Sequence, residues 1–331
     1  MASPFRYVVS DMDGTLFSPD HVVSNYTRDT LRKLVHEHGV TPILATGRHF
    51  PDVKIIANNL KKFIWGDGTT IDDAPPPSSP SRAPMMYILT SNGAVAHNAV
   101  THELVFQTCL DPVVAEKLYQ LLPDTEEVVN TNIYQEDDWI CRIDWPEMMK
   151  VHKESGFQYR YVPNAPPRSA EPVPSTAPGG LSRGVAVGNY DNISKIFFIT
   201  DDEARFPSLA REVQNTAASC GGNSVSLTFS ASDCMDVMAA GVSKGQAIRK
   251  LFSVVLPPKE GRDVVAEALQ ASIAFGDGLN DAEMLTEVGK GCVMDNANPK
   301  LKAQHPELEV VQSNGDDGVA KKLRSVFGIP L

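Results

Sequence analysis

Short apolar runs that end in polar or glycine residues recur along this 331-residue sequence. The first covers residues 5–10 and leads into DMDGT at 11–15. A second, at 40–45, ends in TGR at 46–48, and a third, at 273–275, ends in GDGLND at 276–281. Apolar runs of this length, bounded by turn signals, are typical of buried strands. The pattern therefore predicts a sheet whose strands each deliver polar side chains at one end.

Helical periodicity fills the spaces between these runs. The first part of the chain reads as strand 5–10, a helix capped by Ser24, strand 40–45, a helix over 51–60 and strand 86–90. After GVSKG at 241–245 the alternation resumes. It predicts helices over 244–254, 280–288 and 317–327 and strands over 273–275, 292–294 and 309–311. Strands that alternate with helices indicate a parallel sheet with helices on both faces.

The middle of the chain, between about 95 and 237, has a different rhythm of short strands and helices. It predicts helices over 111–122, 145–154 and 202–218 and strands over 128–134, 139–143, 193–199, 224–229 and 235–238. We therefore predict an α/β fold, a doubly wound parallel sheet formed by residues 1–92 and 240–331. An α+β cap domain over 93–239 is inserted into it. Proline-rich stretches at 74–84 and 163–180 favour loop insertions rather than regular pairing. A domain inserted at the carboxyl ends of the strands acts as a lid that excludes water and selects substrates.

Two acids, Asp11 and Asp13, stand at the end of the first predicted strand, and Gly14 permits a turn after them. In open α/β sheets ligands bind beyond the carboxyl ends of the strands, at a topological switch point. Two unit charges about 4 Å apart repel by roughly 4 kcal/mol at an effective dielectric near 20. Such a pair persists if a cation lies between the acids or if one acid stays protonated. The alternative is that Asp11 caps the turn and Asp13 is solvated.

Composition narrows the function classes. The formal net charge of -11 argues against a nucleic-acid or anionic-membrane binder. No apolar run approaches the roughly 20 residues of a membrane helix, and the early first strand leaves no room for a signal peptide. The five cysteines show no CxxC pairing and read as reduced core residues, and the eight histidines show no metal-ligand spacing. We expect a cytoplasmic protein, either a monomer or a homodimer, without nucleic-acid or membrane partners.

Four segments, in this order and spacing, resemble the haloacid dehalogenase superfamily of phosphatases and phosphotransferases: DMDGT at 11–15, LATGR at 44–48, GVSKG at 241–245 and GDGLND at 276–281. SNGA at 91–94 and VMDNA at 293–297 resemble its Cof-like branch, which carries a large α/β cap. The resemblance covers the whole chain in outline. The two proline-rich stretches depart from the family's pattern. The resemblance therefore does not define the shape of the cap.

The resemblance implies that Asp11 attacks phosphorus to form an aspartyl-phosphate and that Asp13 acts as general acid and base. It also implies Mg²⁺, a cation that takes hard oxygen ligands. Asp11, the backbone carbonyl of Asp13 and Asp277 are the expected ligands, and Asp281 is expected to orient them or to serve as an alternate ligand.

Phosphate contacts are expected from the Thr46 hydroxyl, from the open backbone at Gly47 and from Lys244. A lysine in a first helical turn opposes the helix macrodipole by about 0.3–1 kcal/mol, a cost that a bound phosphate would explain. Arg48 is expected to hold the substrate, and the alternative is a solvent-facing arginine at a helix start. Asn280 fits phosphate binding or a helix cap, and Asn92 fits a substrate contact or a turn.

The function expected from the sequence is a Mg²⁺-dependent phosphatase that acts on a small-molecule phosphate ester, such as a sugar phosphate, a nucleotide or a cofactor phosphate. A phosphotransferase or mutase would use the same intermediate with an acceptor in place of water. A non-catalytic metabolite-binding module would lack one of the acids or the lysine, and none is missing from this chain.

Overall fold

The computed structural model describes residues 5–66, 85–123, 128–146, 155–163, 166–168 and 184–330. The predicted loop insertion at 74–84, most of the one at 163–180 and most of a helix expected over 145–154 lie outside these residues. Among the described residues, no helix combines the length and the apolar content that a membrane crossing requires.

The chain divides into two compact units. Unit 1 consists of Met1–Gly47, Val53–Phe106 and Ser243–Leu331, and unit 2 consists of Arg48–Asp52 and Gln107–Val242. The predicted domain boundaries at 92/93 and 239/240 stay a prediction. The first lies before two strands, β4 (Val95–Asn98) and β5 (Leu104–Gln107), that extend the sheet of unit 1.

Unit 1 contains, within the described ranges, an eight-stranded sheet in the order β14-β13-β12-β1-β2-β3-β4-β5. Its other strands are β1 (Tyr7–Ser10), β2 (Thr41–Ala45), β3 (Tyr87–Thr90), β12 (Ser272–Gly276), β13 (Lys290–Met294) and β14 (Glu309–Val311). The six strands from β14 to β3 pair in parallel, and β4 joins β3 antiparallel. The chain order reverses between β1 and β12, which makes that junction the topological switch point.

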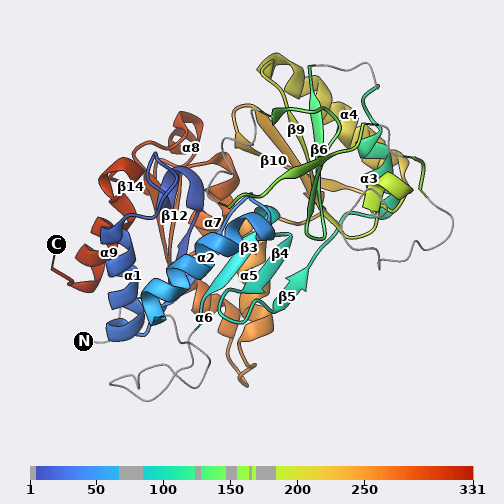
Figure 1. The fold of residues 1–331 in the computed structure, drawn as a ribbon. Helices are drawn as coiled ribbons and strands as arrows, with labels where there is room; N and C mark the ends of the chain where they lie inside the picture. Colours follow the sequence, from blue (N-terminus) through green and yellow to red (C-terminus); the bar gives the residue numbers. More distant parts are fainter. Residues whose placement is uncertain are drawn as a thin grey trace. The chain divides into compact units, whose positions relative to one another are not determined.

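Helices cover both faces of this sheet, as the doubly wound fold requires (Figure 1). They are α1 (Asn25–His38), α2 (Phe50–Trp65), α5 (Lys244–Val255), α6 (Val264–Gln270), α7 (Ala282–Glu287), α8 (Pro299–Gln304) and α9 (Gly318–Phe327). In Figure 1, α1 and α2 lie in front of the sheet and α5 and α6 behind it. Ser24 caps α1 by accepting a hydrogen bond from the Thr27 amide at 3.0 Å.

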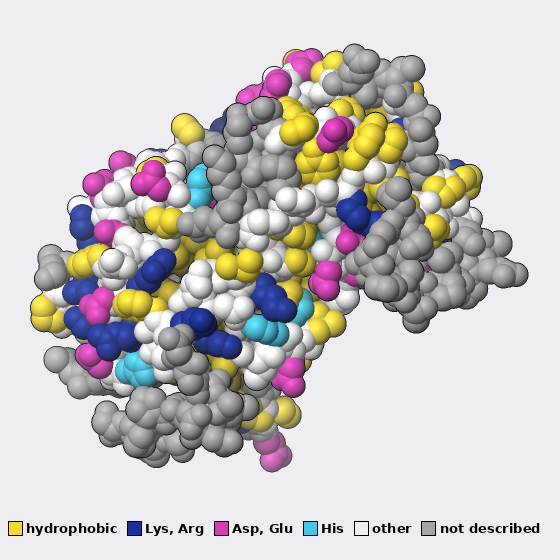
Figure 2. Space-filling model, viewed as in Figure 1, with side chains coloured by type: hydrophobic (Ala, Val, Ile, Leu, Met, Phe, Trp, Pro, Cys, Tyr) yellow, Lys and Arg dark blue, Asp and Glu magenta, His cyan; other side chains and the backbone are white. Residues whose placement is uncertain are grey.

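The surface of unit 1 carries basic side chains on the face where α2 lies. Figure 2 shows lysine, arginine and histidine side chains side by side there. Burial lowers the pKa of His97 on β4 and of His102 after it, and the charge of Lys54 on α2 lowers both further.

Unit 2 is an α+β unit. Its sheet has the order β10-β11-β9-β6-β7-β8, with β6 (Asn130–Gln135), β7 (Asp138–Cys141), β8 (Tyr159–Tyr161), β9 (Ile193–Ile199), β10 (Val225–Ala231) and β11 (Cys234–Ala239). The pairs are antiparallel except β7 with β8. Two helices, α3 (Pro112–Tyr119) and α4 (Phe206–Ser219), belong to the same unit.

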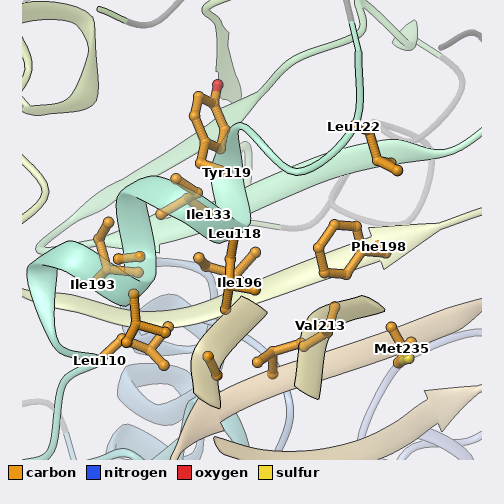
Figure 3. Packing of buried hydrophobic residues seen from close by; sticks show 14 of the residues in the cluster. Leu110, Leu118, Tyr119, Leu122, Ile133, Ile193, Ile196, Phe198, Val213 and Met235 are labelled. Carbon is orange, nitrogen blue, oxygen red and sulfur yellow. The ribbon is translucent and has the colours of Figure 1, made fainter. Parts of the chain in front are cut away.

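The core of unit 2 forms between the helices and one face of the sheet (Figure 3). Leu118 from α3 and Val213 from α4 are fully buried in one cluster with Ile196 and Phe198 from β9. The alternate positions carry a second cluster that includes Tyr134, Trp139 and Phe197, because successive side chains of a strand point to opposite faces.

Candidate functional site

The adjacent ends of β1 and β12 bring two acids together. Ser10 lies opposite Phe275 in the parallel register, and the Asp11 amide donates to the Phe275 carbonyl at 3.0 Å. Asp277 follows the last residue of β12 directly. The switch point of the sheet therefore places Asp11 and Asp277 at one edge, because neighbouring parallel strands end on the same side.

A tight turn after Asp11 carries the next residues of the motif. Gly14 has φ +72°, a backbone conformation that favours glycine. A side chain at this position would also collide with the Asp277 carboxylate. Thr15 is buried, and its hydroxyl donates to Asp277 Oδ1 at 2.6 Å. The Asp13 side chain is 39% exposed, with His21 Nδ1 3.4 Å from its carboxylate.

Lys244 brings a buried cation into the same site. Its side chain is only 1% exposed, and its Nζ lies 2.5 Å from Asp11 Oδ1 and 2.6 Å from Asp281 Oδ1. Lys244 is the first residue of α5, so the fold places this lysine at the positive end of the helix macrodipole. The two carboxylates stabilise the ammonium there.

Asp281 organises the loop after β12. Its Oδ2 accepts the amides of Asp277 and Gly278, both at 2.9 Å, while its Oδ1 accepts Lys244. Each carboxylate oxygen of Asp281 thus has a protein donor. This arrangement suits the predicted role of orienting the neighbouring acids.

The electrostatics of the site reflect crowded negative charge. Burial raises the pKa of Asp11 well above its ordinary value, and Asp281 and Asp277 add to this rise while Lys244 opposes it. Burial and the Asp281 carboxylate raise the pKa of Asp277 to about 6, and the Thr15 hydrogen bond acts in the other direction. Burial by itself lowers the pKa of Lys244, but Asp11 and Asp281 raise it above its usual range.

Asp11, Asp277 and Asp281 form a group whose ligand oxygens all lie within 4.8 Å of one another. Three carboxylates and one ammonium leave an excess of negative charge in a buried space. An all-oxygen donor set of this kind fits a hard divalent cation such as Mg²⁺. The raised pKa values of Asp11 and Asp277 agree with this fit, since a divalent cation would relieve the repulsion that causes part of the rise.

Hydrogen bonds join three of the expected phosphate-binding residues, Thr46 after β2, Asn92 after β3 and Asn280 after β12. Thr46 is 1% exposed, and its backbone accepts the Asn92 amide at 3.0 Å and donates to Leu89 at 2.8 Å. The Asn280 side chain donates to Asn92 Oδ1 at 3.0 Å. Asn92 is buried with φ +55°. A hydrogen bond between the two asparagines was not expected from the sequence.

Gly47 and Arg48 mark a boundary between the units, with Gly47 the last residue of a segment of unit 1 and Arg48 the first residue of a segment of unit 2. Within unit 2, Arg48 donates to the fully buried Asp52 at 3.1 Å. The Arg48 side chain is only 10% exposed, so the alternative of a solvent-facing arginine is wrong.

Sequence reasoning gave no role to Asn296. This residue donates to the Gly14 carbonyl at 2.7 Å and accepts the Asn314 amide at 2.9 Å. It therefore supports the turn that carries Asp13. Asn296 belongs to the VMDNA segment, but a single sequence does not indicate which backbone group an asparagine binds.

A family model of haloacid dehalogenase-like hydrolases matches residues 8–323. The chain belongs to this family. The resemblance that the motifs indicated is therefore confirmed over almost the whole length of the protein, and the α/β core with an inserted cap is the fold of this haloacid dehalogenase-like hydrolase.

The family comparison extends to full-length relatives. The chain is 36% identical over 329 residues to a Haemophilus influenzae protein that carries the provisional name of phosphatase, with 99% of each chain covered. It is 28% identical over 306 residues to an Enterobacter HMP-PP phosphatase, covering 92% of this chain and 90% of that one. Among solved structures, a subclass IIB sugar phosphatase of the same family superposes with a TM-score of 0.67 at 16% identity, covering 98% of this chain and 100% of the other.

Proposed function

We propose that this hydrolase is a Mg²⁺-dependent phosphatase that cleaves a small phosphorylated metabolite through an aspartyl-phosphate on Asp11. The observation that carries the proposal is the buried contact of Lys244 with Asp11 beside Asp277 and Asp281. A lysine and a cluster of acids at one buried point suit the joint binding of a phosphate and a cation. The lysine offsets the negative charge of the phosphate, and the acids offset the positive charge of the cation.

In the first half-reaction, an Asp11 carboxylate oxygen bonds to phosphorus as the bond from phosphorus to the leaving oxygen breaks. Asp13 donates its proton to that leaving oxygen, which departs as an alcohol. Lys244 holds a phosphate oxygen and offsets the charge that accumulates on the phosphoryl group. The larger exposure of Asp13, 39% against 8% for the Asp11 side chain, agrees with a role in proton exchange.

In the second half-reaction, water attacks the phosphorus of the aspartyl-phosphate. Asp13, now a carboxylate, accepts a proton from that water, and the bond between Asp11 and phosphorus breaks. Inorganic phosphate leaves, Asp11 is restored as a carboxylate and Asp13 is again protonated. The cycle needs no reactant other than the ester and water.

Asp11, the Asp13 carbonyl and Asp277 are the proposed protein ligands of Mg²⁺, with Asp281 orienting them. The bound ion supplies charge neutralisation, which allows a carboxylate to approach an anionic phosphate. Thr46, Gly47, Asn92 and Asn280 are proposed to contact the phosphate, and Arg48 the substrate. The proximity of Thr46, Asn92 and Asn280 in unit 1 supports the first of these assignments.

Small phosphate esters are the proposed substrate class, because relatives of this chain are named as phosphatases and one group of them as HMP-PP phosphatases. The net charge of -11 means that local cations, Lys244 foremost, must attract an anionic substrate. We also propose that the enzyme is cytoplasmic, as expected from its sequence.

A metabolite screen tests the proposal. Purified protein with Mg²⁺ is incubated with sugar phosphates, nucleotides, cofactor phosphates and HMP-PP, and released inorganic phosphate is measured without any added acceptor. We expect release from at least one compound. In a parallel incubation with an added acceptor sugar, phosphate that appears only as a new ester on that sugar would instead establish a phosphotransferase. No turnover of any phosphate ester in either incubation would refute a catalytic role.

A further inference from the structure

The first turn of α5 has to hold a lysine where the helix macrodipole disfavours one. Ser243 caps the helix by accepting the Gln246 amide at 3.1 Å, and Lys244 follows as the first helical residue. The position of the Lys244 ammonium therefore depends on what holds this turn in place.

Glu283 on α7 contacts this turn from both sides of Lys244. One carboxylate oxygen accepts the Ser243 hydroxyl, and the other accepts the Gln246 side-chain amide at 2.6 Å. We propose that Glu283 is a positioning residue that fixes Lys244 for phosphate binding. The proposal rests on the phosphatase function proposed above.

Close packing supports this inference independently of the hydrogen bonds. Gly245 lies between Ser243 and Gln246, and a Cβ atom at this position would lie 2.6 Å from Glu283 Cγ. Glycine therefore lets α5 approach the Glu283 side chain. On another side of the turn, a Cβ atom at Gly93 would collide with the Ser243 carbonyl and lie 2.6 Å from Ala247 Cβ. The start of α5 has little room to shift while these contacts exist.

The short segment 281–283 thus contacts both the ammonium of Lys244 and the backbone turn that carries this lysine. Asp281 binds the ammonium at 2.6 Å, and Glu283, two residues later, holds the backbone turn from which the lysine extends. The negative charge of Glu283 at the start of α5 also opposes the unfavourable interaction between Lys244 and the macrodipole. Because the Asp281 carboxylate also accepts the Asp277 amide, Glu283 links the phosphate lysine to the loop that carries the proposed metal ligand.

The test compares Glu283→Ala and Glu283→Gln with the matched control Glu287→Gln. Glu287 lies one turn later on α7 and contacts Gln246 only at 3.5 Å. Displacements of about 1 Å at a reacting centre can cost roughly 100-fold in rate. We expect Glu283→Ala to lower kcat/KM for an aryl phosphate by about 10- to 100-fold and to weaken inhibition by inorganic phosphate. Glu283→Gln, which keeps an acceptor oxygen and the side-chain shape, should recover most of the activity.

A chemical readout separates this inference from the proposed activity. Lys244 is 1% exposed, so acetic anhydride should label it slowly in the wild-type protein, as read by mass spectrometry of peptides. We expect faster labelling of Lys244 in Glu283→Ala, no change in Glu287→Gln and equal labelling of the exposed Lys250 in all variants. Unchanged labelling and unchanged phosphate inhibition in Glu283→Ala would overturn the positioning role, even if the wild-type enzyme is a phosphatase. If Glu283→Ala does not fold, Glu283→Asp, which keeps the charge and shortens the side chain, replaces it. Faster labelling of Lys244 in a folded Glu283→Asp would support the role, and wild-type labelling together with wild-type phosphate inhibition would overturn it.

Discussion

At the residue scale, the site is a set of buried charges. Each charge alone would destabilise the folded protein, and its oppositely charged partners compensate for it. Removing one partner of a buried ion pair leaves an uncompensated charge and is strongly destabilising. Lys244 contacts both Asp11 and Asp281. Each residue of the site should therefore affect stability as well as activity, and the two effects have to be measured separately.

Asp11→Asn tests the nucleophile. An amide cannot form the aspartyl-phosphate, so we expect phosphate release to fall by at least about three orders of magnitude, the scale typical of a removed covalent nucleophile. The variant should stay folded by circular dichroism, since it also removes one of the crowded buried acids. The exposed Asp20→Asn serves as the control and should keep full activity. Turnover near the wild-type level in Asp11→Asn would eliminate the nucleophile role.

Thr15→Val tests the support of the proposed metal site. The Thr15 hydroxyl donates to Asp277 Oδ1 at 2.6 Å, and residues that orient a metal ligand typically contribute 10- to 100-fold to affinity. We expect the Mg²⁺ concentration for half-maximal activity to rise by about that factor. Thr15→Ser keeps the hydroxyl and should restore the wild-type value. Activity that survives exhaustive chelation in the wild-type protein would contradict the metal role altogether.

The sequence allowed the meeting of Asp11 and Asp277 to be predicted, because residues that follow adjacent parallel strands must lie at one edge. It could not reveal the hydrogen bond between Asn92 and Asn280 or the contacts of Glu283. Those contacts depend on how α5, α7 and the end of β3 pack in three dimensions. The hydrophobic periodicity of the chain does not encode the distances between these elements.

At the element scale, the strands and helices with strong apolar patterns were predictable. Two strands, Ile193–Ile199 and Glu309–Val311, match their predicted bounds. The helix expected over 51–60 instead spans Phe50–Trp65, because Ile64 continues the buried row of Val53, Ala57 and Leu60. The missed elements are β4, β5, β8, α6 and α8.

Two physical reasons explain four of the missed elements, β4, β5, α6 and α8. β4 places His97 and Asn98 among its four residues, and β5 has exposed positions at its ends. Short strands of this kind form because a neighbouring strand, β3 for β4 and β4 for β5, supplies hydrogen-bond partners. The local sequence does not carry that contribution. The helices α6 and α8 have seven and six residues, which is too short for a clear helical period.

His97 gives β4 a pH dependence. Burial lowers the pKa of His97 from 6.5 to about 4, helped by the charges of His102 and Lys54. Between these two pH values the unfolded chain binds a proton that the folded chain does not, so the stability contributed by neutral His97 is lost as the pH falls.

We expect His97→Gln to reduce this acid sensitivity. The free energy of unfolding, measured with urea at pH 7 and at pH 5, should fall less between these conditions in His97→Gln than in the wild-type protein. An identical decrease in both proteins would show that His97 does not titrate over this range.

At the scale of the whole molecule, the two units differ in how they use the chain. Unit 1 needs both ends, since β1 pairs with β2 on one side and with β12 on the other. Unit 2 is continuous except for Arg48–Asp52. Among the described residues, its main core cluster lies between Leu110 and Val237.

We therefore expect a fragment of residues 107–242 to fold alone and to unfold cooperatively in urea. Phe198 is fully buried in its core, and large-to-small changes of this kind cost about 3–5 kcal/mol. Phe198→Ala in the fragment should accordingly shift the transition to much lower urea or abolish it. A gradual, non-cooperative loss of circular dichroism signal in the unmodified fragment would mean that unit 2 requires unit 1.

The pairing of β1 with β12, from opposite ends of the chain, also sets the order of events during synthesis on the ribosome. Asp11 is made 233 residues before Lys244, an interval of about 10 to 50 s at typical elongation rates. During that time the inserted unit can fold, while Asp11, the proposed nucleophile, has no contact with Lys244. The newborn chain therefore stays inactive until its final segment emerges, and β1 must be kept from aggregation in the meantime.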